Sequence, residues 1–110
     1  MRNPDDVVEV VITAPRGQWL PDFTRDLVRN GVAACGHHCD IRAVYSWQAQ
    51  VQDEPETRVA LHTTAARVPD IEERLRAQHP YDVPCLLVLP VLGGSADYLE
   101  WVRRSSGTAD

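Results

Sequence analysis

Apolar and polar positions follow two different periods along the first third of the chain. A β-branched run at residues 7–12 contains a single charge, Glu9, which is typical of a strand covered on both faces. Over Trp19–Leu27 the large apolar residues recur every four positions, opposite charged ones, and this spacing predicts a helix that buries one stripe. Asn30-Gly31 supplies the residues that end such a helix.

The middle of the chain is extended and reads as a long β-hairpin. Val32–Trp47 has the pattern of a strand that is unusually long for a small domain, and Gly36 indicates a bulge or bend inside it. Residues 58–63 alternate as a second strand. The polar segment Gln48–Glu56 lies between the two and suits a long hairpin arm.

The last third of the chain predicts a helix, a strand and a short helix. Val68–Leu75 carries an apolar line at helical spacing, and Pro80 ends it because residues before proline avoid helical geometry. Cys85–Leu89 is a buried apolar strand, and the following Pro90 indicates an edge position or a bulge. The apolar residues of Tyr98–Val102 lie at helical spacing and predict a short final helix.

The element order is therefore β-α-β-β-α-β with a C-terminal helix, and the predicted fold class is α+β, a ferredoxin-like sandwich. We expect one domain over residues 1–110, with its core at about 6–104 and a flexible polar tail at 105–110. The helices cover one face of a four-stranded sheet. The other face is apolar, and no element is left in the chain to cover it. An uncovered sheet face and an overlong hairpin both favour an oligomer.

Composition excludes several classes of partner. The net charge is −5, and all 11 basic residues are scattered arginines, so a nucleic-acid partner is not expected. The longest uncharged apolar stretch, Val83–Leu92, is too short to cross a bilayer, and no basic start precedes a hydrophobic run. We therefore expect no membrane partner and a cytoplasmic protein whose three cysteines are thiols.

Six short strings fall in the order and spacing of one known family. They are VITAP at residues 11–15, VAAC at 32–35, YSW at 45–47, HTT at 62–64, HPYDVP at 79–84 and DYLEW at 97–101. Over about residues 7–103 the chain thus resembles the CutA family, the divalent-cation tolerance proteins. The resemblance implies a ferredoxin-like subunit in a tight homotrimer, a link to copper and other divalent ions, no established catalytic reaction, and the cytoplasm in bacteria.

Departures from the family pattern define the first candidate metal site. In the bacterial family member whose copper site is best known, the ligands are a first-strand cysteine and two adjacent histidines. The matching positions here are Ile12, Gln78 and His79, so only one ligand is kept. His62 and Cys85 replace a lysine and a glutamate that face the inter-subunit cleft in relatives. Imidazole and thiol are softer ligands than the groups they replace. His79, His62 and Cys85 are therefore the first choice for a site holding copper or another divalent or soft metal ion.

The second choice is Cys35, His37 and Cys39 in the long strand. On a regular strand these three share a face while His38 points away. A rise of about 3.3 Å per residue separates the two cysteine Cα atoms by roughly 13 Å, too far for one metal ion or for a disulfide. A cysteine–histidine pair completed from another subunit stays open, beside a plain buried thiol with exposed histidines.

Tyr45, Trp47 and Tyr81 either form an aromatic wall of a ligand cleft or pack the trimer interface, and aromatic residues at such positions favour packing. The leading hypothesis is a trimeric CutA-like protein of copper or other divalent-metal tolerance that binds ions in inter-subunit clefts. The alternative is a signalling module like the nitrogen regulators, with a nucleotide or small molecule in those clefts. An enzyme is not expected, because serine-nucleophile motifs, phosphate loops and paired catalytic carboxylates are absent from the sequence.

Overall fold

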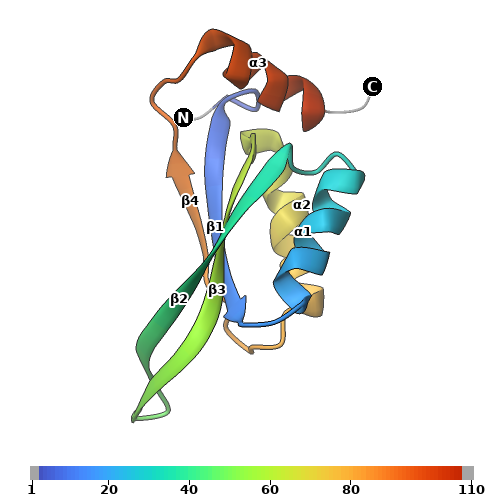
Figure 1. The fold of residues 1–110 in the computed structure, drawn as a ribbon. Helices are drawn as coiled ribbons and strands as arrows, with labels where there is room; N and C mark the ends of the chain where they lie inside the picture. Colours follow the sequence, from blue (N-terminus) through green and yellow to red (C-terminus); the bar gives the residue numbers. More distant parts are fainter. Residues whose placement is uncertain (1–2, 108–110) are drawn as a thin grey trace.

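The chain folds into a four-stranded antiparallel sheet with two helices on one face (Figure 1). The computed structural model describes residues 3–107. The elements are β1 (Val7–Pro15), α1 (Trp19–Arg29), β2 (Cys35–Trp47), β3 (Gln50–Thr64), a 3₁₀ turn (Ala65–Arg67), α2 (Val68–Gln78), β4 (Leu86–Pro90) and α3 (Ala96–Ser105). The strands lie in the order β2-β3-β1-β4. This arrangement confirms the α+β, ferredoxin-like prediction. Among the described residues, no helix has both the length and the apolar content that crossing a bilayer requires.

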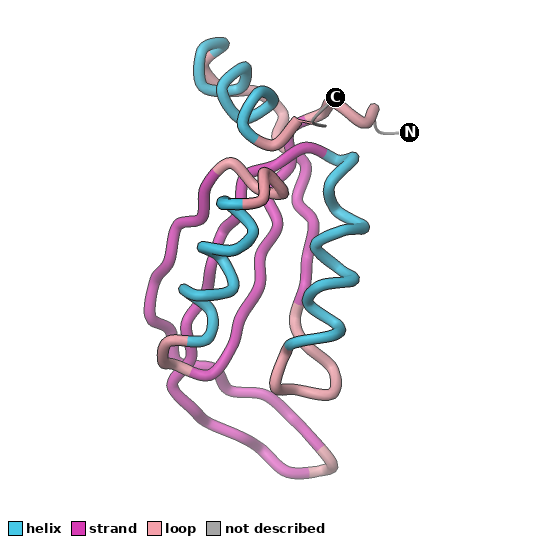
Figure 2. The backbone as a smooth tube through the Cα atoms, turned by 90° about the vertical axis from the view of Figure 1, so that its right-hand side faces the viewer, coloured by secondary structure: helices cyan, strands magenta, loops and turns pink. Residues whose placement is uncertain are grey.

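The two-residue turn Gln48-Ala49 sets the length of the β2–β3 hairpin. Both turn residues have positive φ, 52° and 62°, as in the tight turns whose twist matches the strands they join. The segment Gln48–Glu56 is therefore strand almost from its start, and the predicted arm is confirmed as a paired one. Figure 2 shows the hairpin running well beyond the ends of α1 and α2. The molecule consequently measures 44 × 25 × 24 Å.

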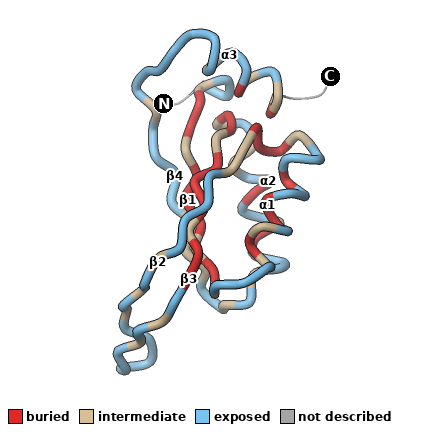
Figure 3. The backbone as a smooth tube through the Cα atoms, in the orientation of Figure 1, coloured by how far each residue is buried: buried red, intermediate tan, exposed pale blue. Residues whose placement is uncertain are grey.

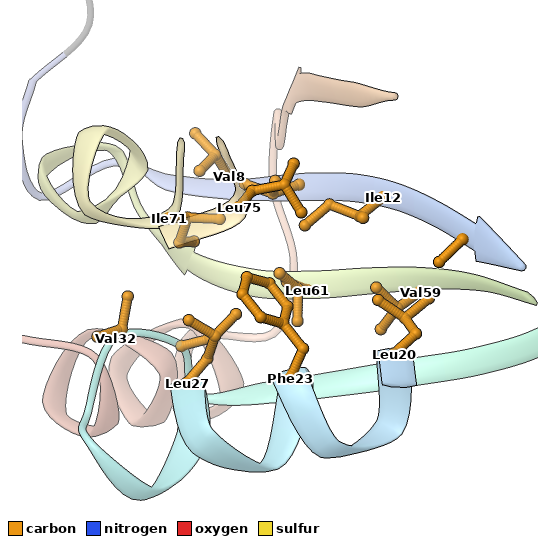
Figure 4. Close-up of a cluster of buried hydrophobic side chains, with 13 residues drawn as sticks. Val8, Ile12, Leu20, Phe23, Leu27, Val32, Val59, Leu61, Ile71 and Leu75 are labelled. Carbon is orange, nitrogen blue, oxygen red and sulfur yellow. The ribbon is translucent and has the colours of Figure 1, made fainter. Parts of the chain in front are cut away.

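Burial is concentrated where the helices cover the sheet. Figure 3 shows it along β1, the inner half of β3 and the inward sides of both helices, while the arm and β4 are largely exposed. In Figure 4, alternate β1 residues such as Val8 and Ile12 point toward Phe23 of α1 and Leu75 of α2. Each fully buried aliphatic side chain of this kind contributes about 1.5–3 kcal/mol to the free energy of unfolding. The opposite sheet face, here called the open face, carries the intervening residues.

Gly36 does not mark a bulge, so that prediction is wrong. The β2–β3 pairing runs without interruption from Cys35 opposite His62 to Trp47 opposite Gln50. A Cβ atom at Gly36 would instead lie 2.6 Å from Cγ2 of Thr24 in α1 and 3.0 Å from Cγ2 of Val59. Glycine is needed here because α1 approaches the backbone of β2 closely.

The strand also begins later than predicted, at Cys35 and not at Val32. Val32–Ala34 is buried and apolar, as a strand would be, but part of its backbone closes the end of α1. The Val32 amide donates to the Leu27 carbonyl at 2.8 Å, after Gly31 turns the chain at φ 70°. Periodicity alone does not separate such a buried connection from a strand.

β4 is an edge strand, as Pro90 indicated. The expectation that nothing in the chain covers the open face is wrong at one end. There α3 packs across β1, where Val7, Ala34 and Val102 form a small second core. Leu87 of β4, on the same face further along, stays 59% exposed.

The polar tail does not begin at Ser105 as predicted. Ser105 ends α3, and Ser106 is fully buried, with its hydroxyl donating to the Val102 carbonyl at 2.6 Å. Arg67 donates to the carbonyls of Ser106 and Gly107 at 3.1 and 2.8 Å. Residues 108–110 of the predicted tail lie outside the described residues.

Gly36→Ala should destabilise the fold, because the new methyl group enters a space that Thr24 and Val59 already fill. Overpacking of this kind costs about 1–3 kcal/mol. Urea unfolding at a fixed protein concentration measures it. Gly93→Ala is the matched control, because a Cβ atom there meets nothing within 4 Å. Equal stability of the two variants would contradict the close approach of α1.

Candidate functional site

A cysteine and two histidines come together on the open face, at the end near α3. Cys35 lies directly opposite His62 in the β2–β3 pairing, and His37 is two residues further along the same face. The donor atoms of the three side chains all lie within 4.8 Å of one another, the one such group of three among residues 3–107. Cys35 Sγ is 3.7 Å from His62 Nδ1, and the two imidazole rings meet edge to face at 5.1 Å. We call these three residues the thiol–imidazole cluster.

Two neighbours complete the hydrogen bonding of the cluster. Glu9 lies opposite His62 on β1, and His62 Nε2 donates to its Oε2 at 2.9 Å. His62 Nδ1 is then the acceptor, and the hydroxyl of Tyr98 in α3 donates to it. The same hydroxyl is 3.3 Å from Cys35 Sγ. The pKa of Tyr98 is raised to about 12, mainly by burial and secondly by the hydrogen bond to Cys35. The phenol is therefore neutral at physiological pH.

The second-choice set is divided by the structure. Cys35 and His37 belong to the cluster, but Cys39 is exposed and lies opposite Arg58. The strand rise that separated the two cysteines in the sequence analysis is the reason. His38 points to the other face, as predicted, where its Nε2 lies 3.1 Å from Thr24 Oγ1, and burial there lowers its pKa.

His79 is engaged in the fold through both ring nitrogens. It follows α2, where Nε2 donates to the Thr13 carbonyl at 2.8 Å and Nδ1 accepts from the Tyr81 amide at 2.9 Å. The ring also packs edge-on against Trp19, with centroids 5.0 Å apart. A metal ion at either nitrogen would displace one of these bonds. In this chain His79 therefore ties the loop after α2 to β1 and α1.

One groove of about 990 Å³ lies at the base of the hairpin arm. Its lining includes Tyr45, Trp47, Tyr81 and Cys85. The structure thus brings together the three aromatic residues that the sequence grouped. The loop at residues 80–85 forms the wall facing β2. The volume is at the upper end of what small-molecule sites usually have.

Two tyrosine–carboxylate pairs give the groove an acidic character. Tyr81 donates to Glu56 at 3.0 Å, and Glu56 is only 4% exposed. Tyr45 donates to Glu54 at 2.8 Å. The pKa of Tyr81 is raised well above its ordinary value, mainly by burial and secondly by the hydrogen bond to Glu56. The pKa of Tyr45 is raised chiefly by its bond to Glu54.

The first-choice set does not converge within one chain. His62 lies opposite Glu9, whereas Cys85 directly precedes Leu86, the partner of Ile12. Glu9 and Thr13, whose carbonyl accepts from His79, are about 13 Å apart along β1. A set of His62, His79 and Cys85 would need donors from different subunits, and it stays a prediction about the assembly.

Sequence reasoning named the members of the cluster but assigned them to two different sites, and it missed Glu9 and Tyr98. The missing signal was the hairpin register. Once the turn is placed at Gln48-Ala49, antiparallel counting puts Cys35 opposite His62.

Residues 8–105 match the model of one protein family, described as CutA1 divalent ion tolerance protein. The chain belongs to the CutA family. It is 33% identical over 99 residues to the divalent-cation tolerance protein CutA of Thermus thermophilus, which covers 89% of this chain and 96% of that protein. The solved structure of the Thermus thermophilus protein Cut A1 superposes with a TM-score of 0.87 at 32% identity, covering 92% of this chain and 99% of that one. CutA1 from Oryza sativa gives 0.89 at 28% identity, covering 94% and 96%.

These matches confirm the resemblance drawn from the six strings, and with it the ferredoxin-like fold. They also place the thiol–imidazole cluster in a protein family named for divalent-ion tolerance. This CutA chain carries thiol and imidazole donors, which suit copper and zinc rather than magnesium.

The tyrosine pKa values predict the alkaline behaviour of the protein. All three tyrosines have raised pKa values when folded, so the unfolded chain loses phenolic protons near pH 10 while the folded chain keeps them. Stability is therefore unaffected by these groups below about pH 10 and falls as pH rises above it. At pH 10.5, tyrosinate absorbance should be lower in native protein than in denatured protein, where it is about three-quarters complete.

Glu56→Gln tests which contact raises the pKa of Tyr81. It should lower the pKa of Tyr81 and leave the pKa of Tyr98 unchanged, because only Tyr81 of the two bonds Glu56. Identical titration curves for native and denatured protein would contradict the assigned contacts.

Proposed function

We propose that this protein is a homotrimer that binds copper or other divalent metal ions in clefts between its subunits and serves metal tolerance. The observation that carries the metal part is the convergence of Cys35, His37 and His62, with donor atoms within 4.8 Å of one another. Thiolate and imidazole ligands favour copper, zinc and similar ions. Membership of the divalent-ion tolerance family supports the same reading.

Exposed apolar residues support the assembly. On the edge strand β4, Leu87 and Leu89 are 59% and 39% exposed on the open face. On the arm, Val44, Trp47 and Val51 are 65%, 40% and 79% exposed. A two-stranded hairpin has no core of its own and is marginally stable alone. A second and third copy of the chain, packed against the arm and the open face, would bury these residues and turn the open face into the wall of a cleft.

The nitrogen-regulator-like alternative receives less support from the charges of the groove. A nucleotide needs cations or free backbone amides for its phosphates. The groove is lined by Glu54, Glu56 and Asp82, and its cation Arg42 forms a two-bond pair with Asp53 at 2.7 and 2.9 Å. An anionic ligand would meet mainly negative charge there.

We place the protein in the cytoplasm. All three cysteines are free thiols in the structure, and reduced thiols are typical of that compartment.

Equilibrium dialysis of the reduced protein should separate the two functions. We expect copper and zinc ions to be retained at about one per chain, because soft donors converge once within residues 3–107 of each subunit. Magnesium and adenine nucleotides should not be retained. Retention of a nucleotide without any metal would favour the signalling module instead.

Trp47→Ala should weaken the trimer, because truncation of a large buried aromatic side chain costs about 3–5 kcal/mol. Sedimentation equilibrium over a range of concentrations measures the effect. Val28→Ala on α1 is the control, since Val28 is equally exposed, at 40%, but lies away from the arm and the open face. A wild-type protein that sediments as a stable monomer would refute the trimer.

A further inference from the structure

We propose that the metal ion is held by Cys35, His37 and His62 of a single subunit, with Glu9 orienting His62. This inference rests on the proposed metal-binding function and assigns it a site. It differs from a site built of His62, His79 and Cys85, because every protein ligand comes from two neighbouring strands of one chain.

The spacing of the donors fits a shared ion. With metal–sulfur bonds of about 2.3 Å and metal–nitrogen bonds of about 2.0 Å, a tetrahedral ion holds its sulfur and nitrogen ligands about 3.5 Å apart. Cys35 Sγ and His62 Nδ1 are 3.7 Å apart. His37 is exposed and has room to turn the remaining distance, since its donor atom already lies within 4.8 Å of the other two.

Glu9 makes His62 a better ligand than an unsupported histidine. Its carboxylate accepts the Nε2 proton, which leaves Nδ1 with a lone pair that accepts from the Tyr98 hydroxyl and lies 3.7 Å from Cys35 Sγ. Ligating histidines commonly have a carboxylate behind them that sets the tautomer and raises the basicity of the ring. The His62 and Glu9 side chains are only 17% and 33% exposed, so the pair is held in place by its surroundings.

Tyr98 marks the position of the ion. Its hydroxyl contacts both Cys35 Sγ and His62 Nδ1, the two atoms that an ion would bridge. In the absence of metal the hydroxyl thus satisfies both groups, and it must move aside when an ion binds. α3, which carries Tyr98, then covers a site with three protein ligands and one open position.

The ligand set selects the class of ion. One thiolate and two imidazoles suit four-coordinate Zn(II) or Cu(I) and are unsuited to Mg(II), which requires oxygen ligands. Cysteine is the ligand with the clearest spectroscopic signature, because a thiolate bound to Co(II), the usual stand-in for Zn(II), gives a charge-transfer band.

Single-cysteine variants of the full chain provide the test, because the sequence has only three cysteines. Cys39→Ser with Cys85→Ser leaves Cys35 alone, and Cys35→Ser with Cys39→Ser leaves Cys85 alone. Each is titrated with Co(II) under a non-thiol reductant, and Zn(II) affinity is measured by competition with a chromophoric chelator. We expect the band, at one ion per chain, only where Cys35 is present. Adding His62→Gln should abolish it.

Glu9→Gln tests the positioning role. It should weaken Zn(II) binding about tenfold to a hundredfold while the charge-transfer band remains, because the ligands themselves are unchanged. Glu54→Gln, another carboxylate on the open face that bonds Tyr45 instead, is the matched control and should leave the affinity as in wild type. A Glu9 variant that lowers the metal-free melting temperature but keeps full affinity would overturn the role assigned to Glu9.

The remaining outcomes separate this inference from the proposed function. A band in the variant that keeps Cys85 and none in the variant that keeps Cys35 would overturn the site and leave the function standing. Wild-type protein that binds ions without any thiolate band would do the same, since nitrogen and oxygen ligands would then hold the metal. Wild-type protein that retains no ion at all would refute both.

Discussion

The unbroken antiparallel register of β2 against β3 is the constraint on which the rest of the structure depends. It runs over thirteen residue pairs, from Cys35 opposite His62 to Trp47 opposite Gln50, and the tight turn Gln48-Ala49 sets it. A slip of one residue would exchange the two faces of the strand. It would place a side chain of β2 where only Gly36 fits beneath α1, and it would turn Cys35 away from His62. Helix packing and the cluster therefore depend on the same pairing.

The open face serves two purposes that are separated along the sheet. Near α3 it holds the thiol–imidazole cluster, where His62 and Cys35 are hydrogen-bonded to Glu9 and Tyr98. At the arm it is lined by aromatic and acidic side chains around a wide groove, with exposed aliphatic residues nearby. The first region has the donors of a metal site, and the second has the features of a surface that another subunit covers. Assembly through the arm would leave the cluster intact, because its ligands need nothing from a neighbour.

The departures of this chain from the family pattern become consistent once the contacts are known. His62 stands where relatives usually have lysine, and in this chain it lies between a carboxylate and a thiol. A lysine there would be cationic and would supply no lone pair to a metal ion. His79, the retained family histidine, is instead engaged by the Thr13 carbonyl and the Tyr81 amide. One replaced position, His62, thus joins Cys35 and His37 in the cluster, while the retained His79 supports the fold.

The sequence by itself determined the order and type of the secondary-structure elements, the fold class and the family, but not every element boundary. Hydrophobic periodicity indicates which face of an element is buried, and short sequence motifs indicate the family. Both patterns can be read from the sequence without a structure. The hairpin arm and the edge position of β4 followed from the same local patterns. Even the placing of Cys35 and His37 on one face, with His38 on the other, needed only strand alternation.

Only the tertiary structure decided what those residues touch. Cys35 and His62 are 27 positions apart in the sequence, and Glu9 and His62 are 53 positions apart. Their contact therefore depends on which strands pair and in what register. The buried connection at Val32–Ala34 resembled a strand because burial, not extension, makes a segment apolar. Gly36 resembled a bulge because the sequence does not show the helix lying against it. Side-chain contacts between distant segments arise from packing in three dimensions, and a local pattern carries no record of them.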